Sequence, residues 1–386
     1  MEVVIVGGGP AGGVAAKKLS DDGYDVTLFE KERIPRHKHC AGFISQKSIR
    51  LLESTDIDIR DILSELKGLH IRCGDATMEL KLESLAGNVI RDEFDSHLIR
   101  RARDSGAKIV DASRVVDISR GEDGKYLVQS EKKAAECDVV IGADGVNSFV
   151  RRHLGIQYDR SNLGVTVEAE IPVGAEAITE FKETNHYDIG YVPNGYGWIF
   201  PKTKSGTVNA GLWIPRDDVK KLDQPLSAMF SHYIGNHDLS DQKVVPHTYL
   251  IPYKGTVDRF GEGNIILIGD AAGFVGIAGE GIPYAVESGF NAAEAVKKHN
   301  SGNASLEEEY RSTSEGLMEE INEYHVKFNR FFFNPTLFRR TIKLVEKDEY
   351  ISSLMKKLTD ESTSLKEIYR NISYSKLLLA FLKSLP

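Results

Sequence analysis

Cysteine is scarce in this chain, with three in 386 residues and no C-x-x-C spacing. This argues against a disulfide framework and a structural zinc site, and it fits a reducing cytoplasm. No apolar run is long enough to span a bilayer, and the first residues already form a strand-like run, so we expect neither a membrane span nor a signal peptide. With no internal repeat and no low-complexity linker either, we expect a cytoplasmic globular protein of two or more domains.

An excess of positive charge is also lacking, because the formal net charge is −8. This speaks against nucleic acid as a partner. The charge is uneven: residues 325–386 hold 12 Lys and Arg against 6 Asp and Glu, a local charge of +6 that leaves −14 for residues 1–324. This basic tail is rich in Phe and Leu. Two interpretations of it stay open, namely helices that pack back on the sheet and an amphipathic surface that makes peripheral contact with anionic lipid headgroups at the cytoplasmic membrane face.

The N-terminal residues carry a dinucleotide-binding pattern. Residues 3–6 are β-branched and suit a strand buried on both faces, and a helical pattern begins soon after them. Between the two, the glycines of a G-x-G-x-x-G fingerprint are Gly7, Gly9 and Gly12. A second strand, residues 25–29, ends at Glu30, where an acid can bind ribose hydroxyls. This context predicts a bound dinucleotide whose phosphates meet the N-terminus of the helix.

Two loops further along the chain fit the same cofactor. Strand-like residues 139–141 run into a turn that holds Asp144, and residues 265–268 run into Gly269 and Asp270. Asp144 can lie on the diphosphate side of a cofactor or cap the helix that follows, and Asp270 can accept from a hydroxyl of the cofactor or act as a plain helix cap. The loop 279–282 then precedes a helix whose amides can stabilise negative charge.

The fingerprint, the Asp144 loop and the Asp270 loop, in this order, resemble the p-hydroxybenzoate-hydroxylase-like group of FAD proteins. The resemblance implies FAD as the cofactor, held in extended form along the first domain. It also implies cofactor contacts from Arg91, at the start of a helix, and from the backbone of Val115 in the next strand. The residues expected to bind FAD are Gly7, Gly9, Ala11, Gly12, Glu30, Cys40, Ala41, Gly42, Arg91, Val115, Asp144, Asp270, Gly281 and Ile282.

Strand-like pieces at residues 69–82, 163–213 and 247–251 predict an antiparallel sheet inserted into the first domain, and the pattern is helical from about residue 306. The expected fold class is α/β, with a Rossmann-type FAD-binding domain, an inserted antiparallel-sheet substrate domain and a helical C-terminal region. The expected boundaries are 1–65, 90–155 and 260–300 for the FAD-binding domain, 66–89 and 156–259 for the substrate domain, and 301–386 for the helical region.

Two stretches narrow the resemblance to the geranylgeranyl reductase family, which saturates isoprenoid chains in archaeal lipids, chlorophyll and related quinones. Residues 193–201, PNGYGWIFP, fit P-x-x-Y-x-W-x-F-P at every fixed position, and residues 38–42, KHCAG, lie in the loop where the flavin ring is expected. A strand would place Tyr196, Trp198 and Phe200 on one face, where they either fill a core or line the channel of a long apolar substrate. The resemblance favours the channel and implies a geranylgeranyl lipid.

The chain departs from the family in two places. The loop at Cys40 reads C-A-G where the family has C-G-G, and the Asp270 loop lacks the usual Asn-Pro before its last glycines. Both differences bear on flavin access and substrate choice.

Cys40 and Tyr196 are the candidate catalytic residues. A lone Cys is most often a small buried hydrophobe, whereas a thiol in a flavin-facing loop can contact the ring or deliver a proton. His37 and His39 beside it suggest a metal, but no fourth ligand is spaced to complete a site, so no metal is expected. The implied reaction is reduction of an isolated C=C bond, with hydride given to one carbon and a proton to the other, and the acid is Cys40, a nearby Tyr or water.

Two other functions stay open: a flavin monooxygenase that uses NAD(P)H and oxygen on an aromatic substrate, and a FAD-bearing redox-partner or binding protein without its own substrate. A flavin halogenase is disfavoured because the W-x-W-x-I-P motif is absent. The chain has one dinucleotide fingerprint, so its sequence leaves the electron donor open between a ferredoxin and NAD(P)H.

Overall fold

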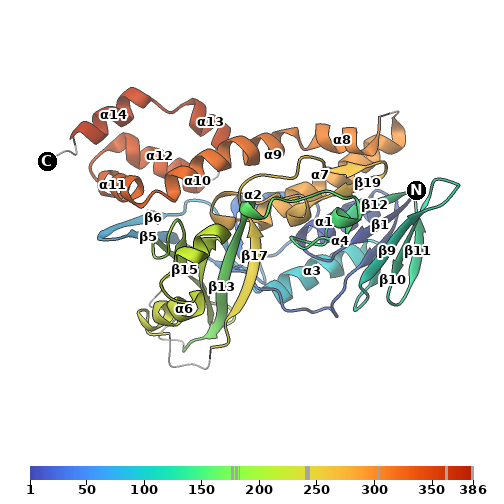
Figure 1. Ribbon diagram of the computed structural model, residues 1–386, viewed down its shortest axis with the longest axis horizontal. Coiled ribbons are helices and arrows are strands. Elements are labelled where there is room, and N and C mark those ends of the chain that lie inside the picture. Colours follow the sequence, from blue (N-terminus) through green and yellow to red (C-terminus); the bar gives the residue numbers. More distant parts are fainter. Residues whose placement is uncertain are drawn as a thin grey trace.

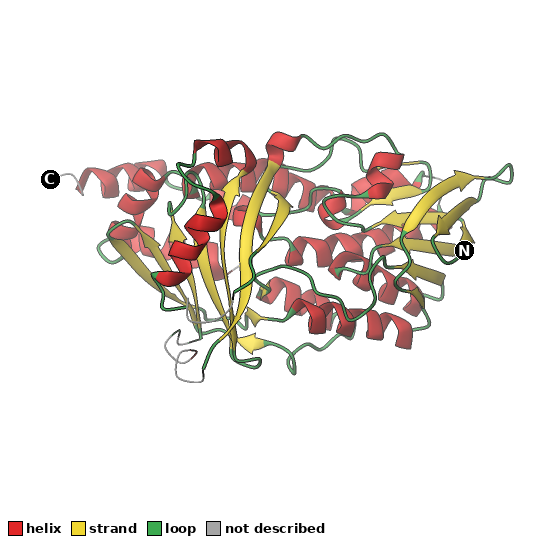
Figure 2. Ribbon diagram, turned by 60° about the horizontal axis from the view of Figure 1, so that its bottom comes forward, coloured by secondary structure: helices red, strands yellow, loops and turns green. Residues whose placement is uncertain are grey.

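The computed structural model describes residues 1–174, 178, 181, 183–239, 244–302, 304–360 and 364–383. The molecule is elongated, with the strands near the N-terminus at one end and helices α11, α12 and α14 of the C-terminal region at the other (Figure 1). Figure 2 shows the strands gathered in two groups with helices between them. The expected α/β class, with a Rossmann-type part, a largely antiparallel sheet and a helical C-terminal region, is confirmed.

The first group is a six-stranded sheet around the N-terminal strand, in the order β18-β19-β12-β1-β2-β8. Its strands are β1 (Glu2–Val6), β2 (Asp25–Phe29), β8 (Lys108–Val110), β12 (Val139–Gly142), β18 (Gly261–Glu262) and β19 (Ile265–Leu267). All neighbours pair in parallel except β18 with β19. Residues 3–6 are buried, as a run of β-branched residues in a central parallel strand predicts.

Three helices pack together beside this sheet: α1 (Pro10–Asp21), α3 (Arg91–Asp104) and α7 (Ile282–Ser301), with α1 in contact with both of the others. α1 starts within the fingerprint, with Gly9 as its N-cap and Pro10 in its first turn. A proline fits there because its missing N–H belongs to the amides that lack an intrahelical partner.

The second group is a seven-stranded sheet in the order β17-β13-β16-β15-β14-β5-β6. Its strands are β5 (Gly68–Cys73), β6 (Ala76–Lys81), β13 (Leu163–Pro172), β14 (Thr184–Ile189), β15 (Tyr196–Lys202), β16 (Thr207–Pro215) and β17 (His247–Pro252). The expected antiparallel pairing is wrong at one junction, because β14 pairs with β5 in parallel. These strands come from chain segments more than a hundred residues apart, so no hairpin fixes their direction. Within the expected strand-like region 163–213, residues 175–177, 179, 180 and 182 lie outside the described residues.

The two faces of the seven-stranded sheet pack against different elements. One face packs against α6 (Leu226–Gly235), which contributes Phe230, Tyr233 and Ile234 to a compact apolar cluster. The other face carries the aromatic residues of β15 and belongs to a cluster that includes residues of the C-terminal helices. The second face is the one that turns toward the cavity described below.

Smaller elements connect the two sheets. Two three-stranded sheets consist of β9 (Val115–Arg120), β10 (Tyr126–Ser130) and β11 (Ala134–Cys137), and of β3 (Phe43–Ile44), β7 (Gly87–Asn88) and β4 (Ser64–Glu65). Short helical segments are α2 (Gln46–Glu53), α4 (Phe149–His153), η1 (Arg160–Asn162), η2 (Arg216–Lys221), η3 (Gly269–Ala271) and η4 (Ile277–Gly279). The strand expected to hold Val115 is β9, and its hairpin partner β10 keeps it paired as far as Arg120.

The C-terminal region is helical, as expected. Its elements are α8 (Leu306–Thr313), α9 (Glu315–Glu319), the π-helical η5 (Glu320–His325), α10 (Val326–Phe332), α11 (Pro335–Val345), α12 (Glu349–Asp360), α13 (Leu365–Arg370) and α14 (Tyr374–Lys383). α11 packs on β5 and β6 and buries Phe338 and Ile342 there. On its outer side Arg339 and Lys343 both donate to the exposed Asp75. Within the described residues, no helix is both long and apolar enough to cross a membrane.

The contact between α1 and α7 predicts the effect of a single methyl group. A Cβ built on Gly289 of α7 would lie 2.4 Å from the Ala11 carbonyl oxygen, whereas a Cβ on Gly316 of α9 meets nothing within 4 Å. We expect Gly289→Ala to destabilise the protein by about 1–3 kcal/mol, because the helices must separate. Gly316→Ala is expected to be neutral or to stabilise by up to about 1 kcal/mol through helix propensity. Equal unfolding midpoints for the two variants in thermal melts would contradict this packing.

Candidate active site

One continuous cavity of about 1430 Å³ runs from the glycine fingerprint to the aromatic face of the seven-stranded sheet. Its wall includes all the residues expected to bind cofactor or substrate, with the exception of Gly12. Gly12 lies behind the wall, where a built Cβ would come 2.0 Å from the Gly7 carbonyl oxygen. It therefore lets α1 start directly against the end of β1, which is the packing role expected for the third glycine of a fingerprint.

The turn after β1 requires glycine at its first position. Gly7 has a φ of +109°, and a built Cβ would lie 2.3 Å from the Ala143 carbonyl oxygen. The backbone of the fingerprint thus lies against the loop that follows β12, at the carboxyl ends of two neighbouring parallel strands. Ligands of open α/β sheets bind at this edge.

Glu30 organises the next part of the wall. Its Oε2 accepts from the Gly8 amide at 2.8 Å, and its Oε1 accepts from the Glu32 amide at 3.0 Å. Arg36, which sequence reasoning missed, lies with Nε 3.2 Å from Glu30 Oε2 and with a terminal nitrogen 3.0 Å from Asp95 Oδ2. That guanidinium reaches the fingerprint, 3.7 Å from a Cβ built on Gly9.

A cation at this place fits the negative charge of a diphosphate. One feature of the sequence could have indicated Arg36. Residues 31–38, KERIPRHK, are rich in basic side chains and lie between Glu30 and the loop expected to face the flavin.

Arg91 is buried and connects α3 with the Cys40 loop. Its Nε and one terminal nitrogen donate to the two oxygens of Asp95 at 2.8 and 2.9 Å, and its side chain lies beside Cys40. Burial opposes the charge, but Asp95 and Cys40 together hold the pKa of Arg91 above its usual range. Cys40 accepts a weak hydrogen bond from the Gly42 amide, at 3.4 Å. The thiol is therefore held in place, while its catalytic role stays a prediction.

The Asp144 loop and the Asp270 loop are joined by Arg151. This buried side chain donates to the Ala271 carbonyl at 2.9 Å and to the Val146 carbonyl at 2.6 Å. Asp144 itself caps α4, because its Oδ2 accepts from the Phe149 amide at 2.6 Å and from the next amide at 3.1 Å. Asp144 therefore acts as a helix cap, as one of the two interpretations expected, but only through its Oδ2 atom.

The other oxygen, Asp144 Oδ1, is buried without a hydrogen-bond partner among the described residues, and burial raises the pKa of Asp144. Burial likewise raises the pKa of Asp270, which lines the same cavity. An orphaned acceptor in a cradle of glycine backbone fits the hydroxyl- and diphosphate-bearing part of FAD. The residues present therefore fit the expected cofactor.

The Asp270 loop ends in a strained residue that faces the aromatic sheet. Ala278 has a φ of +55°, which is uncommon for a residue with a side chain. Its amide donates to Asn329 of α10 at 3.2 Å, and its carbonyl accepts from the Tyr196 hydroxyl. Burial raises the pKa of Tyr196 well above its ordinary value of 10. Strand β15 and α10 thus hold the cofactor loop from both sides, and the catalytic role of Tyr196 stays a prediction.

The aromatic residues of β15 form both a core and a cavity wall. Tyr196, Trp198 and Phe200 share one face of the strand, are at most 7% exposed and all line the cavity. Further aromatic rings come from outside the strand, since Phe333 stacks on Trp213 with centroids 4.9 Å apart and Tyr187 meets Phe200 at 5.1 Å. The wall continues onto the C-terminal helices through Phe332, Phe338, Leu358 and Leu365.

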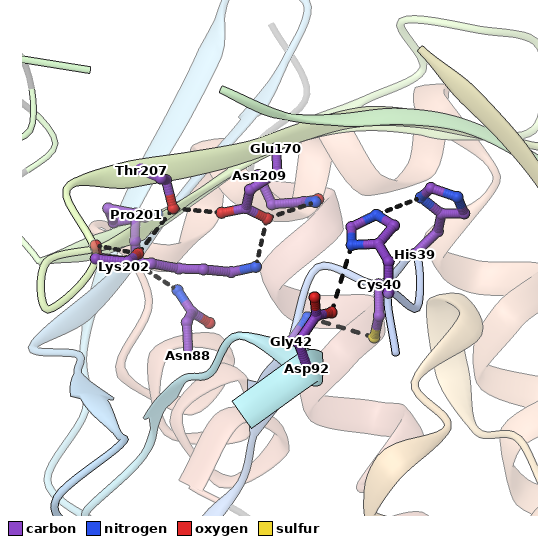
Figure 3. A network of polar contacts seen from close by, with 12 residues as sticks. His39, Cys40, Gly42, Asn88, Asp92, Glu170, Pro201, Lys202, Thr207 and Asn209 are labelled. Carbon is purple, nitrogen blue, oxygen red and sulfur yellow. Dashed lines mark hydrogen bonds and ion pairs between the residues drawn. The ribbon is translucent and has the colours of Figure 1, made fainter. Parts of the chain in front are cut away.

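A chain of polar side chains fixes the orientation of the buried Trp198, and Figure 3 shows its far part, where Lys202 and Asn209 both reach Glu170. The indole Nε1 donates to Asn209 Oδ1 at 2.8 Å, and Asn209 Nδ2 donates to Glu170 Oε2 at 3.2 Å. Lys202, only 2% exposed, donates to the same carboxylate oxygen at 2.7 Å. Sequence reasoning missed these residues. The sequence does contain a signal for them, because polar side chains alternate with apolar ones along strands that otherwise look like core strands.

Three histidines gather beside the Cys40 loop. His37 Nε2 lies 3.1 Å from His39 Nδ1, and the rings of His39 and His247 stack with centroids 4.1 Å apart. Burial, with the charges of His247 and His37, lowers the pKa of His39 to about 4. No group of three or more His, Cys, Asp or Glu side chains with the geometry of a metal site occurs in the described part of the chain.

Replacement of Glu30 by Gln is expected to weaken FAD binding about 10- to 100-fold. The change removes the charge that accepts two loop amides and pairs with Arg36, and hydrogen bonds to a charged group are each worth about 1.5–3 kcal/mol. Fluorescence titration of the apoprotein with FAD measures the effect. Glu122→Gln, on the exposed hairpin between β9 and β10, is the matched control. A Glu30→Gln protein that binds FAD as the control does would show that Glu30 is not part of the cofactor site.

Replacement of Asn209 by Leu tests the polar chain. It leaves the Trp198 indole N–H without its acceptor, and an unsatisfied buried donor costs about 1–3 kcal/mol. The chain has two tryptophans, so Trp213→Phe leaves Trp198 as the single indole emitter. In that background we expect Asn209→Leu to shift the emission of Trp198 and to lower the unfolding temperature. Unchanged emission would contradict the proposal that Asn209 fixes the orientation of the Trp198 indole.

Comparison with known proteins agrees with this geometry. Residues 1–317 match the family described as FAD binding domain. An uncharacterized protein of Methanosarcina barkeri is 34% identical over 303 residues, which cover 76% of this chain and 74% of that protein. Digeranylgeranylglycerophospholipid reductase of Methanosarcina mazei is 30% identical over 310 residues, again 76% of this chain and 74% of that protein.

Among solved structures, a geranylgeranyl bacteriochlorophyll reductase-like protein of Thermoplasma acidophilum has the same fold, with a TM-score of 0.78 over 100% of this chain and 96% of that chain at 21% identity. The family match and the similarity to the Methanosarcina reductase agree with the cavity, in which a FAD-type cradle adjoins an aromatic wall. The chain is a FAD-dependent oxidoreductase that belongs to the geranylgeranyl reductase family.

Proposed function

We propose that this protein saturates isolated C=C bonds of geranylgeranyl chains, in the biosynthesis of archaeal-type membrane lipids. The observation that carries the proposal is the single cavity in which the FAD-type cradle opens onto the face of Tyr196, Trp198 and Phe200. A hydroxylase of small phenols needs polar groups that orient its substrate, whereas a long apolar wall suits a prenyl chain. The name of the Methanosarcina mazei relative supports this substrate class.

FAD would be held by the residues already described: the backbone of the fingerprint, Glu30 and Arg36 at the ribose and diphosphate, and the Asp144 and Asp270 loops. Gly281, the N-cap of α7, would place helix amides near the ring. Reduced FAD bound there supplies the hydride for the alkene.

The chain's own residues would orient the alkene and exclude water. An isolated alkene has no carbonyl to polarise, so the site must hold it flat and dry while charge develops on carbon. The faces of Trp198 and Tyr196 suit this, because the electron-rich face of an aromatic ring attracts positive charge. The rings that α10 and α11 contribute close the apolar part of the cavity.

The electron donor stays open between a ferredoxin and NAD(P)H. The lipid would enter beside the C-terminal helices, where Leu358, Ser364 and Leu365 belong to the cavity wall. The basic tail supports peripheral contact with anionic headgroups, since its charge is +6 against −14 for the rest of the chain.

The function is tested with the holoenzyme under strictly anaerobic conditions. Dithionite serves as reductant, and the substrate is a phospholipid with geranylgeranyl chains in detergent. We expect the lipid to gain two mass units for each reduced bond, with reoxidation of the flavin at the same rate. NADPH oxidation that requires oxygen and is stimulated by a phenol would support the hydroxylase in its place. Flavin reduction with no change in any lipid would support a redox-partner or binding protein.

A further inference from the structure

A buried glutamate lies on the cavity wall and has no place in the cofactor cradle described above. Glu168 is in the middle of β13, is 3% exposed and lines the cavity. On this strand Val167 and Ala169 point into the apolar cluster under α6. Because side chains alternate along a strand, Glu168 points to the opposite face, the one that carries the aromatic residues of β15.

The sheet register brings Glu168 beside Trp198. Glu168 pairs with Gly211 of β16, and Gly211 pairs in turn with Trp198 of β15. Gly211 leaves room for the indole, since a built Cβ would lie 2.2 Å from Trp198 Cζ2. The indole therefore covers the backbone of the strand that lies between the two residues.

The cations around Glu168 have other partners. Lys202 donates to Glu170, Arg91 binds Asp95, and Lys38 has its Nζ 3.3 Å from the centroid of the Tyr249 ring. Glu168 Oε1 is buried and has no hydrogen-bond partner among the described residues. His247 stands across from Glu168 on β17. The carboxyl group thus faces the cavity without the ion pair that a buried charge needs.

This environment favours the neutral acid. Burial raises the pKa of Glu168 to about 7; Glu170 adds to the rise, whereas Lys38, Lys202 and Arg91 oppose it. A carboxylic acid with this pKa is still protonated in about half of the molecules at neutral pH, which suits a general acid.

We propose that Glu168 is the acid that donates the proton to the alkene, an inference that rests on the proposed function. The O–H bond of its carboxyl group breaks and leaves both electrons on the carboxylate. The π pair of the alkene forms a C–H bond with that proton at the less substituted carbon. The hydride supplied by the reduced cofactor completes the more substituted carbon, and the released carboxylate takes a new proton from water. The external donor, dithionite in the assay, restores the two electrons.

The two other side chains considered as the acid, Tyr196 and Cys40, have their polar atoms in contact with other groups. The Tyr196 hydroxyl already donates to the Ala278 carbonyl. The sulfur of Cys40 accepts from the Gly42 amide and lies beside the positive charge of Arg91. Both side chains are positioning groups in this scheme, and Glu168 is the catalytic acid.

The pH dependence follows from the sign of the shift. The proton donor is present below about pH 7 and is lost as pH rises through that value. In single-turnover reoxidation of the dithionite-reduced holoenzyme by the geranylgeranyl phospholipid, we expect the rate to fall above pH 7. Glu168→Gln, which keeps the shape but cannot donate a proton of that acidity, is expected to lower the rate about 10²- to 10⁴-fold and to abolish this pH dependence. Glu168→Asp is expected to recover part of the rate.

A second measurement does not depend on turnover. Infrared difference spectra of the holoenzyme, recorded without substrate, should show a carboxylic C=O band that titrates near pH 7. The band should be lost in Glu168→Gln. It should remain in Glu170→Gln, the matched control on the same face of β13, but titrate at lower pH, because Glu170 adds to the rise in the pKa of Glu168 and its removal frees Lys202.

The outcomes separate the two proposals. A wild-type enzyme that leaves the lipid unchanged overturns the proposed function, and the acid role with it. A wild-type enzyme that reduces the lipid, together with a Glu168→Gln variant of equal rate and unchanged pH profile, overturns the acid role alone. Absence of the Glu168 band from the wild-type spectra also overturns the acid role. Loss of the band, the rate and the pH dependence together supports it.

Discussion

The close approach of β1 and β12 at their carboxyl ends is the constraint on which the rest of the structure depends. Val6 pairs with Gly142, and the turn that follows brings Gly7 against the Ala143 carbonyl with no room for a side chain. This contact sets the fingerprint, the Asp144 loop and the start of α1 in one place. Arg151 extends it to the Asp270 loop, so three segments far apart in the sequence form one cradle. A buried guanidinium suits that task because its donors reach two carbonyl groups at fixed angles.

The cavity face of the seven-stranded sheet holds charged side chains as well as aromatic rings. Glu170 and the buried Lys202 form an ion pair that is not expected to add much stability by itself, because desolvation of Lys202 offsets the attraction. Its use is geometric: through Asn209 it fixes one orientation of the Trp198 indole. Two residues away on β13, Glu168 lacks such a partner and stays protonated to higher pH. On the same face, Glu170 thus positions Trp198, and Glu168 is the proposed proton donor.

Much of the cofactor cradle could be predicted because its pieces are local. A strand, a glycine turn, a helix and an acid follow one another within thirty residues, and each has a fixed geometric reason. Residues whose role depends on distant partners gave no such signal. Arg36 lies in a loop that reads as polar and irregular, and only the fold brings it between Glu30 and Asp95. Glu168 reads as the polar position of an alternating strand, and only the register with Gly211 and Trp198 shows that it lies on the face that carries the aromatic wall. The parallel pairing of β14 with β5 was missed for the same reason.

In the basic tail, the apolar and the basic residues of one helix, α11, lie on different sides and have different partners. Phe338 and Ile342 of α11 are buried against the aromatic sheet, while Arg339 and Lys343 on the outer side bind Asp75 of the turn between β5 and β6. The packed-helix interpretation therefore describes α11, and its apolar face cannot be offered to a lipid surface at the same time. Contact with anionic headgroups would have to use charges on the outer side, with the apolar chain of the lipid passing into the cavity. The helices would then position the lipid through its headgroup and keep water from the alkene through their buried rings.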